Sequence, residues 1–120
     1  KEYEEVILVG HSMGGYLANQ LSAKFNQPAV LINPSIFPHD NKPEICDIDT
    51  MFQVSNSKVN ILVENDDELF NIPKQKELLL KLPNNYHVEF FNNGHHRINR
   101  ISDIAYSIAN VSKYNYPEFI

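Results

Sequence analysis

A serine flanked by glycines, between an apolar run and an amphipathic run, constrains how this chain can fold more than any other feature. Residues 10–14 read Gly-His-Ser-Met-Gly. The preceding residues 6–9 are continuously apolar and rich in β-branched side chains, as in a strand buried on both faces of a parallel sheet. In the following residues 13–25, apolar side chains recur at i, i+4 and i+8, which predicts a helix that packs this face on the sheet. These side chains are Leu17, Leu21 and Phe25.

The rest of the chain alternates short strand-like runs with longer helical runs. Strands are expected at residues 28–33, 58–65 and 86–91, and helices at residues 73–82 and 101–108. Parallel strands need long crossover connections, which helices normally supply. The order predicts an α/β fold, a single domain over residues 1–120 whose mainly parallel sheet carries helices on both faces.

Residues 34–57 are the exception, because they contain three prolines and no sustained apolar period. Long irregular connections inside compact domains are uncommon and often serve as lids or binding loops. We expect either a lid-like loop or a plain surface excursion here. If it is a lid, Phe37, Met51 and Phe52 are candidates to line a substrate site, although ordinary packing also explains apolar residues of this kind.

Composition and charge exclude several classes of protein. The net charge of −5 comes with no basic cluster, which argues against a nucleic-acid binder. No apolar run reaches the length of about 18 residues that a membrane span needs. Cys46 is the only cysteine, so no disulfide can form within the chain, and the N-terminus does not resemble a signal peptide. A cytoplasmic setting is therefore expected.

Polar residues follow three of the predicted strands, where α/β sheets place reacting groups. Ser12 follows the first strand, an acidic turn at residues 65–68 follows the third, and a His-His pair lies in residues 93–96 after the fourth. A nucleophile, an acid and a base are what acyl transfer by a serine enzyme requires. A sharp turn that lifts the Ser12 side chain clear of the sheet requires residues almost without side chains two positions before and after the serine, and Gly10 and Gly14 meet this requirement.

The spacing alone leaves the base and the acid open. Among the five histidines, His11 is expected to point away from Ser12, His39 lies in the irregular loop and His87 lies within a strand. His95 and His96 remain as candidates for the base. The acid that orients it is one of Asp66, Asp67 and Glu68.

From residue 6 to about residue 108, the chain resembles the small α/β-hydrolase esterases of the YqiA/YcfP type. The resemblance rests on "GHSMGGYLA", "LINPSIFP", "NDDELFN" and "GHHRI". It implies that the nucleophile is Ser12, that the acid is Asp67 and that the base is His96. In that fold the residue after the nucleophile donates an oxyanion-hole N–H, which is Met13 in this sequence.

The same resemblance implies that, in a complete hydrolase, other strands precede the strand at residues 6–9 that leads into Ser12. We therefore expect that residues precede Lys1 in the whole protein, including the second oxyanion-hole donor, or that another chain covers the edge at residues 6–9 by self-association. Loss of one oxyanion donor typically costs about 10²–10³ in kcat. The 120 residues alone are thus expected to form a poor enzyme.

These observations predict a serine hydrolase that cleaves carboxylic esters or thioesters through an acyl-enzyme. Its partner is a small-molecule acyl ester or thioester, and the chemistry requires no metal or cofactor. The alternative is a binding or scaffolding protein that has the α/β-hydrolase fold and does not turn over, because a fold does not fix a function.

Overall fold

The computed structural model describes residues 5–41 and 52–112, which form four strands and four helices. The strands are β1 (Leu8–His11), β2 (Ala29–Ile32), β3 (Val59–Glu64) and β4 (Tyr86–Phe91). The helices are α1 (Met13–Phe25), α2 (Pro38–Asn41), α3 (Ile72–Leu79) and α4 (Ile101–Val111).

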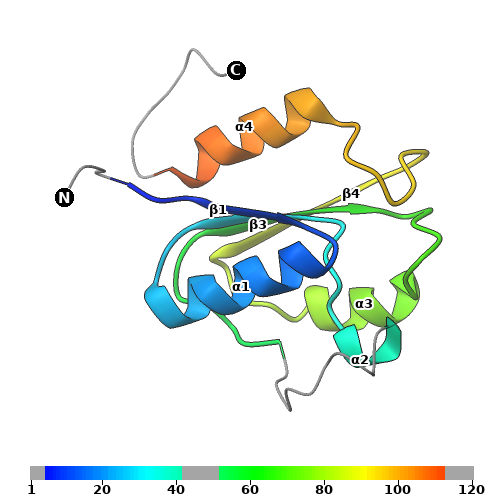
Figure 1. The fold of residues 1–120 in the computed structure, drawn as a ribbon, viewed down its shortest axis with the longest axis horizontal. Coiled ribbons are helices and arrows are strands. Elements are labelled where there is room, and N and C mark those ends of the chain that lie inside the picture. Colours follow the sequence, from blue (N-terminus) through cyan, green and yellow to red (C-terminus); the bar gives the residue numbers. More distant parts are fainter. Residues whose placement is uncertain (1–4, 42–51, 113–120) are drawn as a thin grey trace.

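The four strands pair in parallel in the order β1-β2-β3-β4. Helices α1, α2 and α3 lie on one side of the sheet and α4 on the other (Figure 1). The predicted α/β fold is thereby confirmed. The first strand begins at Leu8 rather than at residue 6 and extends into the motif, because Gly10 and His11 pair with Leu31 and Ile32.

The core follows the alternation of side chains along the two central strands. All residues of β2 and β3 are buried. Leu31 and Ile61 face α1 and α3, whereas Ile32 and Leu62 face α4. Each such side chain contributes about 1.5–3 kcal/mol when it is fully buried. An apolar layer therefore packs on each face of the sheet and fixes the positions of the strand ends.

Helix α1 presents a different face to the sheet from the one predicted. Leu17, Leu21 and Phe25 are 49%, 42% and 58% exposed. The buried face carries smaller and polar side chains, namely Gly15, Tyr16, Ala18, Asn19 and Ser22. Asn19 accepts a hydrogen bond from the Tyr86 hydroxyl at 2.5 Å and donates to the Gln53 carbonyl at 2.7 Å. The hydrogen bonds of Asn19 offset the cost of burying its polar side chain, so this face can pack closely on the sheet.

The irregular segment predicted at residues 34–57 contains a short helix, α2. Before it, Pro34, Ser35 and Ile36 are buried beside the sheet. Met51 lies outside the described residues. The lid role expected for this segment remains a prediction.

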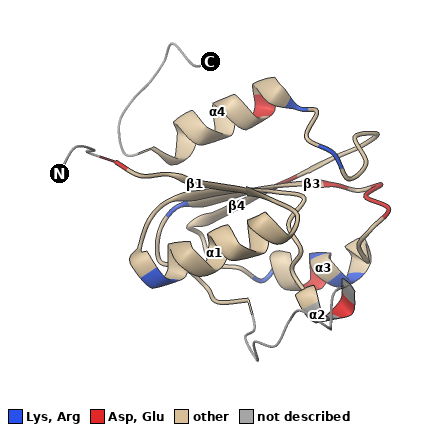
Figure 2. Cartoon of the chain, in the orientation of Figure 1, with Lys and Arg blue, Asp and Glu red and all other residues tan. Residues whose placement is uncertain are grey.

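Charges are distributed unevenly over the molecule. Figure 2 shows acidic residues in the turn that follows β3, at the same edge of the sheet as the start of α1. Among the described residues, no helix is both long enough and apolar enough to cross a membrane.

Truncation of a leucine should have a large effect in the core and a small one on the exposed face of α1. Leu31→Ala removes a side chain with 0% exposure and should lower the free energy of unfolding by about 2–5 kcal/mol. Leu17→Ala, on the exposed face of α1, should change it by about 0.5 kcal/mol or less. Urea denaturation measures the free energy of unfolding of both variants. A loss for Leu17→Ala well above about 0.5 kcal/mol would show that the Leu17 face of α1 is covered in solution.

Candidate active site

The turn between β1 and α1 holds Ser12 in a strained conformation. Its φ of 61° and ψ of −121° lie in a region that residues other than glycine rarely adopt. Such a residue costs on the order of 1–3 kcal/mol, which the surrounding structure must offset. The Ser12 N–H donates to the Ile32 carbonyl at 3.0 Å, and the Ser12 carbonyl accepts from the N–H groups of Gly15 and Ser35 at 3.0 and 2.9 Å. The turn is therefore tied to α1 and to the segment after β2.

The glycines around this turn differ in what the backbone demands of them. A side chain at Gly10 would overlap the Gly14 carbonyl, and one at Gly15 would lie 2.8 Å from the Pro34 side chain. A side chain at Gly14 would meet open space. The sequence interpretation of Gly14 as sterically required was therefore wrong. Gly15, which that interpretation did not consider, is the second position that excludes a side chain.

Asp67 lies in the turn that follows β3, and its side chain is fully buried. Its backbone N–H donates to the Glu64 carbonyl at 3.1 Å, and its Oδ1 accepts from the Leu69 N–H at 2.8 Å. These bonds direct Oδ2 toward the loop that follows β4. There, Oδ2 lies 2.6 Å from His96 Nδ1.

The His96 ring joins this carboxylate to the serine. Its side chain is only 8% exposed, and its Nε2 lies 2.9 Å from Ser12 Oγ. With the Nδ1 proton directed at the carboxylate, Nε2 is the nitrogen left to accept the proton of a serine hydroxyl. The structure thus brings Ser12, His96 and Asp67 into one hydrogen-bonded line across 84 residues of chain.

The neighbouring candidates lie outside this line. The His95 side chain is 54% exposed, and its Nδ1 lies 3.5 Å from Asp66 and 3.8 Å from Glu68. The carboxylates of Asp66 and Glu68 also accept from the backbone N–H groups of His95 and His96, at 3.1 and 3.2 Å. These two acids therefore bind the backbone of residues 92–100, the histidine loop between β4 and α4. The His96 ring itself contacts Asp67.

Two other rings pack against His96. Phe70 makes an edge contact, with ring centroids 4.9 Å apart and an interplanar angle of 85°. His11, which was expected to point away, packs on His96 with ring centroids 4.8 Å apart.

The Nε2 atom of His11 is buried and has no hydrogen-bond partner among the described residues. Burial and, after it, the neighbouring His96 lower the pKa of His11 from 6.5, whereas Asp67 acts to raise it. Because its pKa is lowered, the His11 ring is favoured in its neutral form at this site.

The residues proposed to line a substrate site are separated in the structure. Phe37 and Phe70 line a pocket of 300 Å³ that also includes Leu69, Asn71, Gln75 and Asp40. Phe52 instead packs on Tyr86, with ring centroids 6.1 Å apart. Tyr86 is the first residue of β4, whereas the histidine loop follows the last residue of that strand. Phe52 is thus not brought to Ser12.

The helix N-terminus beside Ser12 supplies backbone donors. Met13 is the first residue of α1, where N–H groups have no acceptor within the helix and the helix dipole favours negative charge. Within residues 5–41 and 52–112, no group of three or more His, Cys, Asp or Glu side chains could hold a metal ion.

The parallel sheet, its helices on both sides and the strained serine turn between β1 and α1 have the arrangement of an α/β-hydrolase fold. Residues 1–76 match the profile of the Uncharacterised protein family (UPF0227), and the chain belongs to this family. The matched residues include Ser12 and Asp67 and end before His96.

A solved structure shares the fold. It is the crystal structure of "Putative hydrolase from Agrobacterium vitis S4", with a TM-score of 0.57 and 22% sequence identity. The alignment covers 90% of this chain and 60% of that one, so the chain spans somewhat more than half the length of its structural relative. Comparison with curated proteins found no match.

His11 predicts a pH dependence of stability. Because its folded pKa is lowered, protonation favours the unfolded state, and the stability contributed by neutral His11 is lost as pH falls below about 6.5 and through the folded pKa. His11→Phe keeps a ring against His96 but cannot be protonated. Urea denaturation between about pH 7.5 and 5.5 should show a steeper loss of stability in the parent protein than in His11→Phe. Parallel profiles would contradict this assignment.

Proposed function

We propose that this protein is a serine hydrolase that cleaves carboxylic esters or thioesters through an acyl-enzyme intermediate. The observation that carries the proposal is the hydrogen-bonded line from Ser12 Oγ through His96 to Asp67, with distances of 2.9 and 2.6 Å. The strained φ of Ser12 supports it, since strain of this kind clusters at functional sites. The description of the structural relative from Agrobacterium vitis S4 as a putative hydrolase agrees with this class.

In acylation, Ser12 Oγ attacks the carbonyl carbon while His96 Nε2 takes the hydroxyl proton. Asp67 accepts the Nδ1–H bond and stabilises the imidazolium that forms. Because Asp67 is buried and His96 nearly so, this stabilisation acts with little screening by water. The tetrahedral intermediate then collapses as His96 donates its proton to the departing alcohol or thiol.

In deacylation, water takes the place of the leaving group. His96 Nε2 accepts a proton from this water as its oxygen attacks the acyl carbonyl. The bond to Ser12 Oγ breaks, His96 returns a proton to that oxygen, and the carboxylic acid departs. The reaction balances with water alone, so these proposed steps require no metal or cofactor.

Met13 is the proposed donor to the developing oxyanion. Its N–H lies at the positive end of α1, directly after the nucleophile. A preorganised donor of this kind is worth about 10²–10³ in kcat. A second backbone donor completes such a hole in related folds.

The acyl group is proposed to occupy the pocket between α2 and the start of α3. Phe70 lines this pocket and also contacts the His96 ring, so the pocket and the reacting groups share a wall. Phe37 forms part of its apolar lining, and an ion pair of 2.6 Å between Lys74 and Asp40 lies at its exposed rim. This mixture of apolar and charged groups suits a small-molecule ester or thioester.

A fluorophosphonate probe tests the proposal, because it reacts with an activated serine and needs no knowledge of the substrate. The whole protein should label on Ser12, and Ser12→Ala in it should abolish both labelling and the hydrolysis of short p-nitrophenyl esters, a loss on the order of 10⁴-fold or more. The matched control is Ser102→Ala, which removes an exposed serine of α4. Absence of labelling and of hydrolysis in the parent protein would favour a non-catalytic binding protein.

A further inference from the structure

A second carboxylate, Glu64, lies at the same strand end as Asp67 and is not used by the proposed chemistry. It is the last residue of β3, and its side chain is only 4% exposed. Its Oε1 accepts from the Gly94 N–H at 3.0 Å and from Arg100 Nη2 at 3.3 Å. Its Oε2 pairs with Arg100 Nε. Glu64 thus contacts the histidine loop at two points, one on each side of His96.

Arg100 closes the far end of that loop. Its Nη2 also donates to the Asn92 carbonyl at 2.6 Å, and its guanidinium lies 4.4 Å from the centre of the Phe91 ring. Phe91 is the last residue of β4, and Arg100 directly precedes α4. The arginine therefore ties the two ends of the loop to each other, with Glu64 between them.

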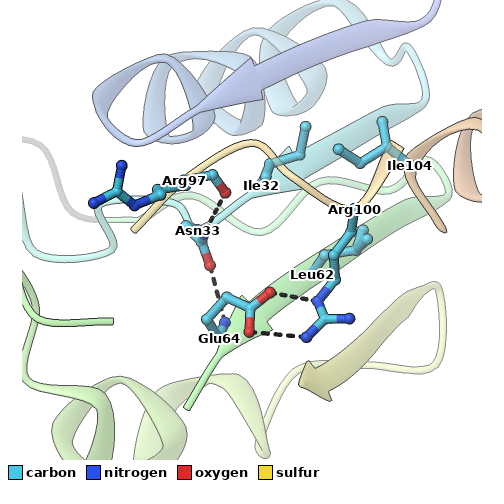
Figure 3. Close-up of a pocket in the computed structure, with 7 residues that line it drawn as sticks. All are labelled: Ile32, Asn33, Leu62, Glu64, Arg97, Arg100 and Ile104. Carbon is cyan, nitrogen blue, oxygen red and sulfur yellow. Dashed lines mark hydrogen bonds and ion pairs between the residues drawn. The ribbon is translucent and has the colours of Figure 1, made fainter. Parts of the chain in front are cut away.

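Asn33, the residue directly after β2, contacts the same loop. Its Nδ2 lies 3.4 Å from the His95 carbonyl and 3.2 Å from the Arg97 carbonyl, so it contacts the backbone on both sides of His96. Its Oδ1 accepts from the Glu64 N–H at 2.9 Å. Figure 3 shows Asn33, Glu64 and Arg100 in one connected network at the edge of a small pocket.

The packing at Gly94 shows how closely the loop backbone approaches this carboxylate. A side chain at Gly94 would overlap the carboxyl group of Glu64. The backbone N–H of Gly94 is therefore held directly on the buried charge, two residues before His96. No side chain separates the loop from its anchor.

We propose that Glu64 is a positioning residue that sets the distance from His96 Nε2 to Ser12 by fixing the histidine loop at Gly94 and Arg100. This inference rests on the proposed function for its kinetic consequence. Asp67 holds the imidazole ring, and Glu64 holds the backbone that carries it, so one strand end controls both. Misplacement of a reacting group by about 1 Å can cost on the order of 10²-fold in rate.

Glu64→Gln tests the role, because it keeps the shape of the side chain and removes its charge. The change should lower kcat and the rate of fluorophosphonate labelling about 10- to 100-fold with little change in KM, since the substrate pocket is not altered. Glu89→Gln, at an exposed position of β4, is the matched control and should leave both rates within about twofold. Arg100→Lys keeps the positive charge and removes the bond to Asn92, so it should give a smaller loss and serves if Glu64→Gln does not fold.

Nitrogen NMR of the His96 ring reads the same role without any turnover. The side-chain ¹⁵N shifts of His96 should report one tautomer, with the proton on Nδ1, in the parent protein and in Glu89→Gln, and a tautomer mixture in Glu64→Gln. A folded Glu64→Gln with unchanged shifts and unchanged labelling would overturn the inference. If the parent protein does not label but the His96 shifts respond to Glu64→Gln, the serine hydrolase proposal fails and the positioning role stands.

Discussion

The parallel register of the four strands is the constraint on which the whole site depends. Because β1 to β4 run in the same direction, the residues that follow them gather at one edge of the sheet: Ser12, Asn33, the turn at Asp67 and the loop at His96. The strands that position the acid and the histidine are paired over six residues, and β3 is buried along its whole length. The last residue of one strand cannot move relative to the last residue of the next without breaking core packing. The short distances between Ser12, His96 and Asp67 are therefore a property of the sheet as much as of the loops.

The site stores strain and buried charge that the scaffold offsets. Ser12 has a positive φ, and His11 has a buried nitrogen with no hydrogen-bond partner within the part of the chain that the structure describes. Glu64 and Asp67 are carboxylates with almost no exposure. A buried ion pair such as Glu64 with Arg100 is weak evidence for stability, because desolvation can cost as much as the pairing gains. The contacts of this pair with the histidine loop indicate a different role, because they fix the backbone of that loop at Gly94 and Arg100.

Much of the fold could be predicted from the sequence, because the alternation of apolar runs indicates parallel strands with helical crossovers. The positions of Ser12, an acid and a histidine at strand ends followed from that order. Other features required three dimensions. The periodicity of α1 groups Leu17 with Leu21, but it does not reveal that the small and polar face beside Ala18 is the one that meets the sheet. His11 on His96, and Glu64 on the histidine loop, depend on contacts between distant segments for which the sequence gives no local signal. Residues 65–68 showed three acids, and backbone bonds in the folded turn decide which one faces the ring.

The central claim is that the strand ends direct His96, and not its neighbour, at Ser12. The most direct measurement compares the second-order rate of fluorophosphonate labelling in His96→Asn and His95→Asn. Asparagine is used at both positions so that the variants match, and it tolerates the positive φ of 59° that His95 adopts. Loss of the base should slow labelling of His96→Asn on the order of 10³-fold or more, whereas His95→Asn should stay within about threefold of the parent protein. Equal rates in the two variants, or a greater loss in His95→Asn, would contradict the account.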